Sequence, residues 1–257
     1  MLKILYIEWL KIRRYRTFWV LSILFIVAML SISYISFEIK NSIDHGREDL
    51  LLGSPFSFPN IWQTITYLSS YALFIPGLFT ITLITNEYNY KTHRQNIIDG
   101  WSRKTFIHAK LAMVIVVALV VTFLVFLNAL LFGLSVGNSS MSVEKSKYLF
   151  YFFIQALSYA NVALIIGLFI KRSGLSIAVF FLYSLILENV LKLIFNKYNS
   201  TIGNYLPLKT TDALIPIPFI GDMMPNQSNI TTALMMSCIY LTLYYMLVSW
   251  KFKTADL

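Results

Sequence analysis

The sequence predicts an all-α membrane protein with six transmembrane helices. Of its 257 residues 57% are hydrophobic and only 13% are charged, whereas about a quarter of the residues of a soluble domain are charged. The charged residues leave uncharged stretches at 17–37, 50–86, 111–143, 148–170 and 223–250, and about 20 helical residues cross a bilayer. These stretches are continuously apolar rather than alternating, which favours helices over a β-barrel.

We therefore expect one transmembrane domain over 1–257. An interfacial helix at 1–15 is followed by spans at 17–37, 62–85, 106–134, 148–170, 174–195 and 231–250, with a cytoplasmic loop at 86–105 and an outer segment at 196–230. With both termini placed in the cytoplasm, 14 of the 21 basic residues but four of the 12 acidic ones lie inside. The positive-inside rule predicts this orientation. The net charge of +9 thus records orientation, and we expect no nucleic-acid partner.

The first 15 residues predict an amphipathic helix in the membrane interface. Leu2, Leu5, Trp9 and Ile12 share one face of such a helix, and basic residues, which include Arg13 and Arg14, accompany them. A helix of this kind lies among lipid headgroups with its cations toward anionic lipids. The alternative is a basic flank that only sets the topology.

The second span and the loop after it carry breaks in the helical pattern. Pro76-Gly77 predicts a kink, because proline removes a backbone hydrogen bond. In the loop, residues 92–98 predict a short helix that ends near Gly100, a favoured helix terminator. Ser102 is then placed to cap the third span, since its hydroxyl can accept a backbone N–H.

The fifth span is the least regular. Residues 173–187 are uncharged, but the apolar pattern continues to Phe195 across Glu188 and Lys192, which are four residues apart and can pair on one helix face. The alternative is a 15-residue re-entrant segment. Beyond it, four prolines interrupt the apolar segment 196–230, which predicts short re-entrant or interfacial helices packed on the protein.

Several polar side chains fall within the predicted spans and so face other helices or a cavity. They mark either a substrate pathway or hydrogen bonds between helices. These residues are Asn128, Gln155, Asn161, Glu188, Asn189 and Lys192.

Motifs of known catalytic centres are absent from the sequence. It has no GxxxxGK[ST] phosphate loop, no HExxH and no CxxC, so ATP hydrolysis by a phosphate loop on this chain is excluded. We expect no catalytic residue, no metal and no cofactor on this chain.

Two segments resemble the membrane subunits of type-2 ABC exporters, among them the bacitracin- and lantibiotic-resistance permeases. EWLKIRRYRTFWVL (8–21) is similar to their opening, where an elbow helix with an acid and several bases precedes the first span. NEYNYKTHRQNIIDGWSRKTFIHAKL (86–111) resembles their loop after the second span: an acid-aromatic pair, a short helix, a small-residue turn, Ser-Arg and a lysine entering the third span. Lys91 stands where the family commonly has glycine.

The resemblance implies a function for the whole chain. Residues 92–98 would be a coupling helix that docks on a separate ATP-binding subunit, present in two copies and carrying ATP and Mg²⁺. A second permease chain, identical or homologous, would complete a transporter in the bacterial inner membrane. The coupling residues would be Glu87, Tyr88, Thr92, Arg94, Gln95, Asn96, Ile97, Ile98, Asp99, Gly100, Ser102 and Arg103.

We therefore expect a permease subunit that exports an amphipathic, peptide or lipid-like substrate. Two alternatives stay open at this point. One is a standalone intramembrane enzyme, which would act without an ATPase and depend on Glu188. The other is a membrane assembly protein that transports nothing.

Overall fold

The computed structural model describes residues 2–44, 55–92, 102–135, 141–198, 201–218 and 229–254. Within these ranges every regular element is a helix, which confirms the predicted all-α class. In chain order they are α1 (Leu2–Ile12), α2 (Arg16–Asp44), α3 (Ile61–Ser70), α4 (Phe74–Asn89), α6 (Arg103–Ser135), α7 (Lys147–Ile170), α8 (Ser173–Phe181), the π-helix η1 (Leu182–Leu187), α9 (Glu188–Lys197), the 3₁₀ helix η2 (Thr201–Tyr205), α10 (Pro207–Asp212) and α11 (Ile230–Thr254).

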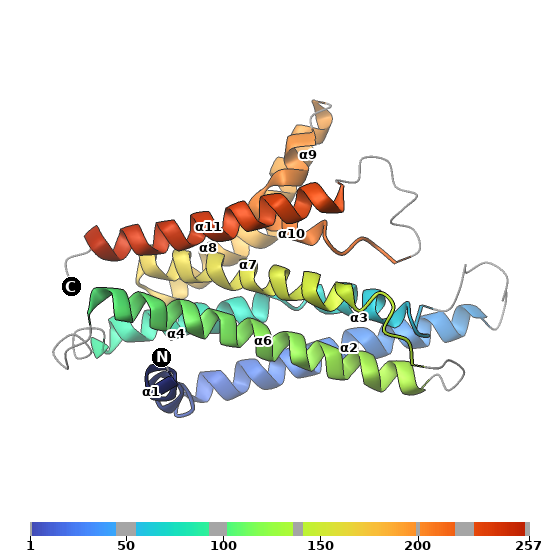
Figure 1. Cartoon of the computed structure of the whole chain (residues 1–257), viewed down its shortest axis with the longest axis horizontal. Helices are drawn as coiled ribbons and strands as arrows, with labels where there is room; N and C mark the ends of the chain where they lie inside the picture. Colours follow the sequence, from blue (N-terminus) through green and yellow to red (C-terminus); the bar gives the residue numbers. More distant parts are fainter. Residues whose placement is uncertain are drawn as a thin grey trace.

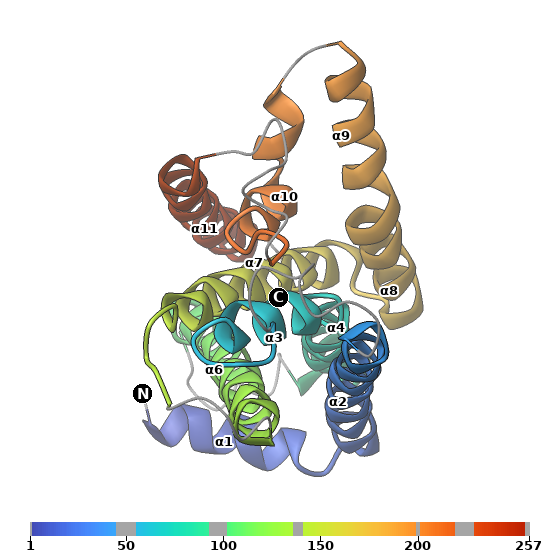
Figure 2. The same ribbon diagram turned by 90° about the vertical axis from the view of Figure 1, so that its right-hand side faces the viewer.

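The long helices lie side by side along the long axis of the molecule (Figure 1). In the described residues, five helices are long and apolar enough to cross a membrane, and the bent pair α3 and α4 makes a sixth candidate. Each of the six apolar stretches of the sequence therefore forms helix. Helix α1 instead runs across the direction of these helices at one end of the bundle, as Figures 1 and 2 both show.

The helix α7 forms the centre of the bundle. It packs against α3, α4, α6, α8, α10 and α11. In its most apolar stretch of 18 residues 61% of the residues are buried, whereas in the other unbroken candidate membrane helices the share is 17–33%. Figure 2 shows α7 between α10 and α11 on one side and α3, α4 and α6 on the other. Because α7 is surrounded by protein, polar side chains on it can be satisfied by other helices rather than exposed to lipid.

The predicted kink in the second span lies just before its proline. Helices α3 and α4 meet at an angle of 50° across the break. Pro76 has no N–H to give to the carbonyl of Ala72, and the N–H of Ile75 takes that carbonyl instead, at 3.0 Å. The next residue, Gly77, faces the ring of Phe180 so closely that a Cβ would overlap it. The bent span can therefore pack tightly against α8.

The fifth span continues through a π-helical turn rather than stopping after 15 residues. Helices α8, η1 and α9 follow one another without a gap, and Ser173–Phe195 is long enough to span a membrane. In Figure 1, α9 rises away from the bundle. The segment after it contains the short helices η2 and α10, and Leu208, Leu214 and Ile215 there are buried.

Candidate functional site: a buried ion cluster

Four charged side chains meet where α1 crosses the bundle. They are Glu8 and Lys11 on α1, Glu87 near the end of α4 and Lys110 near the start of α6, and we call them the ion cluster. The ammonium group of Lys110 lies 2.5 Å from Oε2 of Glu8 and 2.5 Å from Oε1 of Glu87. Lys11 adds contacts of 3.2 Å to Glu8 and 3.5 Å to Glu87. Two carboxylates and two ammonium groups make the ion cluster electroneutral.

The ion cluster is removed from solvent. The exposed fractions of the Lys110, Glu8 and Glu87 side chains are 0%, 2% and 5%. The Lys110 ammonium also lies 5.2 Å from the centre of the Phe106 ring, a distance at which a cation is attracted to the ring face. Charges at such a depth are tolerated only when they are paired and hydrogen-bonded, so the three helices are held in one mutual arrangement.

Helix geometry explains why these positions converge. Leu5, Glu8 and Ile12 follow one another at intervals of three and four residues, and this face of α1 is turned into the protein. Glu87 lies in the last turn of α4, where the helix macrodipole disfavours a carboxylate, so it needs a cation from another element. Lys110 lies seven residues into α6, roughly 10 Å from its start, and supplies that cation.

The lysine charges also lower the pKa of Glu8. Burial by itself would raise the pKa of this carboxyl, but the positive charges of Lys110 and Lys11 outweigh burial and hold the pKa below its usual value of 4.5. Nearby, burial and the negative charge of Glu87 raise the pKa of Tyr15 above 10.0. Glu8 therefore stays ionised and Tyr15 stays neutral near pH 7.

The other residues of the predicted interfacial helix differ in how far they are buried. Ile12 is buried and Leu5 is half-buried, while Arg13 and Arg14 are exposed at the end of α1. The side chain of Trp9 is 43% exposed. The buried face of α1 is therefore centred on Glu8 and not on Trp9, which the sequence places on the apolar face. The side chain of Leu2 lies outside the described residues.

The residues of the predicted coupling loop are described only at its two ends. Tyr88 is half-buried, with the Lys171 ammonium 5.1 Å from its ring centre; Thr92 is half-buried as well. Ser102 lies just before α6, which begins at Arg103, and its hydroxyl accepts the N–H of Thr105 at 3.1 Å, as the predicted cap requires. The remaining predicted residues, Arg94, Gln95, Asn96, Ile97, Ile98, Asp99 and Gly100, lie outside the described residues.

Lys91 stands where the pattern that this sequence resembles commonly has glycine, and the structure shows how the lysine fits there. Its φ angle is 55°, in the left-handed region that glycine adopts without steric cost. The position after α4 thus demands a left-handed residue, and here a lysine fills it. The turn that leads out of α4 is therefore formed in spite of the missing glycine.

The polar residues predicted within the spans do not form one group. Asn128 on α6 donates to the Ser33 hydroxyl on α2 at 2.9 Å, and Gln155 on α7 donates to Asp212 on α10 at 2.9 Å. These two amides join helices. Asn161 instead donates to the carbonyl of Leu157 on its own helix, and Asn189 on α9 donates to that of Leu185 one turn earlier, in η1 of the same span.

Glu188 binds the start of α10 and not Lys192, the partner that the sequence suggests. Its carboxylate accepts the backbone N–H groups of Leu208 and Lys209 at 3.0–3.1 Å, and so holds the start of α10. Among the residues that the structure describes, it forms no ion pair with Lys192, so that predicted pairing is wrong. The physical reason is that the N–H groups at the start of α10 have no partner within their helix and need an acceptor, which the Glu188 carboxylate supplies.

Sequence reasoning passed over Glu8, Lys11, Lys110, Lys209 and Asp212 as site residues. Lys209 lies 2.9 Å from Asp212, next to Gln155 and Tyr159. A usable signal did exist for the ion cluster, since a lysine in an otherwise apolar helix requires carboxylates close by. The sequence does not say which carboxylates, because Glu8 is 102 positions away from Lys110.

A comparison with family models agrees with this architecture. The model described as "ABC-2 family transporter protein" matches residues 4–187, which is more than half of the chain and includes the whole ion cluster. No curated protein matches the chain.

Proposed function

Because the chain belongs to the ABC-2 family of transporter proteins, and is thus the membrane permease of an ABC transporter, we propose that it is the export subunit of a bacterial inner-membrane complex. Two ATP-binding subunits would supply the energy, with ATP and Mg²⁺ bound to them. A second permease chain, identical or homologous, would complete the translocation pathway. The substrate would be amphipathic, a peptide or lipid-like.

The observation that carries this proposal is the position of the ion cluster. It joins α1 to the end of α4 and to the start of α6, and in the sequence residues 90–102 connect α4 with α6. A force applied to this loop would reach α1, α4 and α6 together, because buried charge pairs resist separation. Rigid-body movement of packed helices is a common way to carry a conformational change through a protein.

The charge distribution supports the orientation in this proposal. Arg13 and Arg14 on the α1 side, Lys91 after α4, and Lys171 and Arg172 after α7 lie at ends of spans that the sequence places in the cytoplasm. An excess of arginine and lysine in short loops is typical of the cytoplasmic face. The ATP-binding subunits would dock on this face.

A sharp test is to replace residues 94–98 by a flexible Gly/Ser sequence of equal length in the complex with its ATP-binding subunits. We expect ATP-driven export in proteoliposomes to be lost, while the permease still inserts. The matched control replaces residues 46–50, in a loop that the proposal places on the opposite face, in the same way. Unchanged export after the 94–98 replacement would contradict the coupling role, and failure of the purified chain to associate with any ATP-binding subunit would contradict the proposed assembly.

A further inference from the structure

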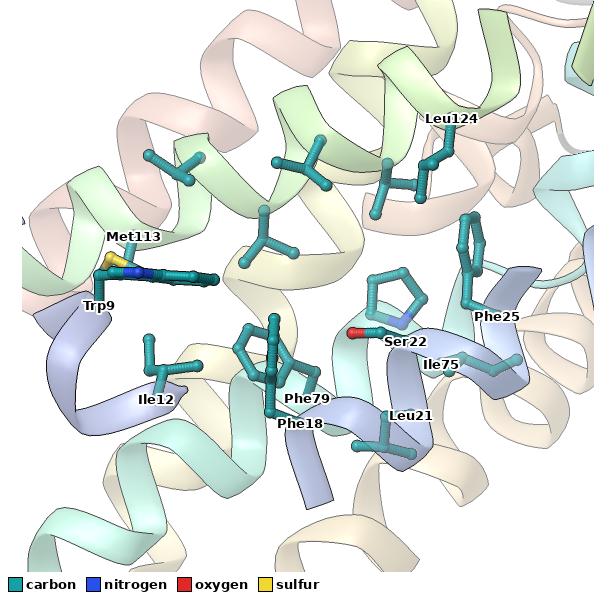
Figure 3. Close-up of a pocket in the computed structure, with 15 residues that line it drawn as sticks. Trp9, Ile12, Phe18, Leu21, Ser22, Phe25, Ile75, Phe79, Met113 and Leu124 are labelled. Carbon is teal, nitrogen blue, oxygen red and sulfur yellow. The ribbon is translucent and has the colours of Figure 1, made fainter. Parts of the chain in front are cut away.

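An apolar cavity of about 230 Å³ lies between α1, α2, α4 and α6, beside the ion cluster. Figure 3 shows the side chains that surround it, with Trp9 at one end and Phe25 and Leu124 at the other. Ser22 supplies the one hydroxyl group in a lining that is otherwise aliphatic, aromatic or thioether. For scale, an apolar cavity of roughly 150 Å³ can take up a benzene molecule.

The cavity has the length of one membrane leaflet. Its wall on α6 runs from Met113 to Leu124, which are eleven residues apart and so about 16 Å apart along the helix axis. Half of the hydrocarbon core measures about 15 Å. Since Trp9 and Ile12 on α1 close the end nearest the membrane surface, the cavity reaches from the interface toward the bilayer centre.

The cavity is open toward the lipid. Val116 and Val120 line it and are 36% and 53% exposed on the side of α6. Around a transmembrane helix this exposure is to acyl chains rather than water. Water is a poor occupant, because a buried water needs two to four polar partners, and the polar groups of the lining side chains are the Ser22 hydroxyl and, at one end, the Trp9 indole N–H. A hydrocarbon chain entering sideways meets no such requirement.

The surface end of the cavity carries positive charge. Arg13 and Arg14 directly follow the lining residue Ile12, and both are exposed. The carbonyl of Arg13 accepts the indole N–H of Trp19 at 3.1 Å, which ties this turn to the first turn of α2. Guanidinium groups bind phosphate with paired hydrogen bonds, so a lipid phosphate above this cavity is attracted, while a headgroup that lacks phosphate is not.

We propose that this cavity binds one acyl chain of an anionic phospholipid from the leaflet in which α1 lies, with the lipid phosphate at Arg13 and Arg14. The chain enters between α1 and α6 and runs past Met113 and Val117 toward Phe25. The bound lipid fills the space behind α1 and so supports the helix that carries Glu8. This inference needs only that the protein is in a membrane, and it stands or falls independently of the coupling role.

The test uses the full-length protein in vesicles that contain phosphatidylglycerol with a photoreactive diazirine at one acyl carbon. In the unmodified protein, we expect a diazirine near the headgroup to label Trp9 and Met113 and one near the middle of the chain to label Phe25 and Leu124, as read by peptide mass spectrometry. Labelling spread evenly over the lipid-facing helices, or independent of the diazirine position, would overturn the proposal.

Variants sharpen the same experiment. Ser22→Phe and Val117→Phe place a ring in the cavity, and we expect each to lower labelling of Phe25 and Leu124 by about tenfold. The matched control is Leu119→Phe, on the same helix but outside the cavity and 53% exposed; it leaves the labelling unchanged. Equal labelling in the filled and control variants, both inserted normally, would overturn the proposal.

A third arm separates the headgroup from the chain. Arg13→Gln with Arg14→Gln should lower competition by unlabelled phosphatidylglycerol by about thirtyfold, the factor for roughly 1 kcal/mol from each of the two basic residues at an anionic surface, and leave competition by diacylglycerol, which has no phosphate, unchanged. An equal effect on both lipids, or none on either, would contradict the phosphate site.

Discussion

The ammonium group of Lys110 lies 2.5 Å from the carboxylate of Glu8, a residue 102 positions earlier in the chain. Lys110 belongs to a transmembrane helix and Glu8 to the helix that crosses the bundle at its end. The contact therefore ties the orientation of α1 to that of α6. Glu87 on α4 shares the same ammonium group, so any change at one of the three residues is felt by two other helices.

Removing the lysine alone should destabilise the protein more than removing all three charges. Lys110→Met leaves two buried carboxylates with less compensation, and breaking a buried ion pair costs about 3–5 kcal/mol. Adding Glu8→Gln and Glu87→Gln removes the uncompensated charges. We expect thermal unfolding in detergent to show a large loss for the single variant and recovery of most of it in the triple variant. Equal melting temperatures of the single and triple variants would contradict the electrostatic account.

Acid should weaken the docking of α1. The folded pKa of Glu8 is lower than its value of 4.5 in the absence of the cluster. Its stabilising contribution is therefore fully present above pH 4.5 and is lost as the pH falls from there through the folded pKa. The protection factors of the α1 amides, which correct for the slower intrinsic exchange in acid, should fall over this interval, and Glu8→Gln should show a smaller fall. The same acid response in Glu8→Gln would assign it to another group.

Lys91→Gly should stabilise the turn after α4. The residue has a φ angle of 55°, and relieving a left-handed side-chain residue gains about 0.5–1 kcal/mol in spite of the greater freedom of glycine in the unfolded chain. The matched control is Tyr90→Gly, one residue earlier, where φ is −93° and glycine should destabilise. Chemical unfolding of both variants distinguishes them, and a destabilised Lys91→Gly would contradict the prediction.

Glu188→Gln should loosen the start of α10. An amide nitrogen cannot accept an N–H, so the bond from Leu208 to one carboxylate oxygen would be lost, and the remaining bonds from Leu208 and Lys209 would go to an uncharged oxygen, at a cost of about 1–3 kcal/mol. Faster hydrogen exchange of these two amides is the expected result. Lys192→Gln, one turn away on the same helix, is the control and should leave the exchange unchanged. Protection that is identical in the two variants would show that Glu188 does not hold α10.

The sequence predicts the helices well because their cause is local. A run of about 20 uncharged apolar residues has one stable arrangement in lipid, and a serine before such a run has a clear use as a cap, as Ser102 shows. The ion cluster depends instead on contacts between elements far apart in the chain. Nothing in the residues around Glu8 states that Lys110 will face it, and a helical wheel places Trp9 rather than Glu8 on the apolar side.

The same limit applies to the membrane interior. Glu188 and Lys192 are four residues apart, and a local argument pairs them. The folded chain instead brings Leu208 and Lys209 to Glu188, because the start of α10 has N–H groups that no helix turn satisfies. A partner of this kind appears only once the path of η2 and α10 is known.

The most direct measurement of the central claim compares ATP hydrolysis and export in proteoliposomes for the wild type and for the triple variant Glu8→Gln, Glu87→Gln, Lys110→Met, each with its ATP-binding subunits. The control is Asn128→Leu with Ser33→Ala, which removes a buried polar pair between α2 and α6 away from the ion cluster. We predict that the triple variant assembles and hydrolyses ATP, but exports at least about tenfold less substrate per ATP, because uncharged side chains let α1 slide on α4 and α6. The control keeps the wild-type ratio. Wild-type export per ATP in the triple variant would contradict the claim that the ion cluster couples the helices.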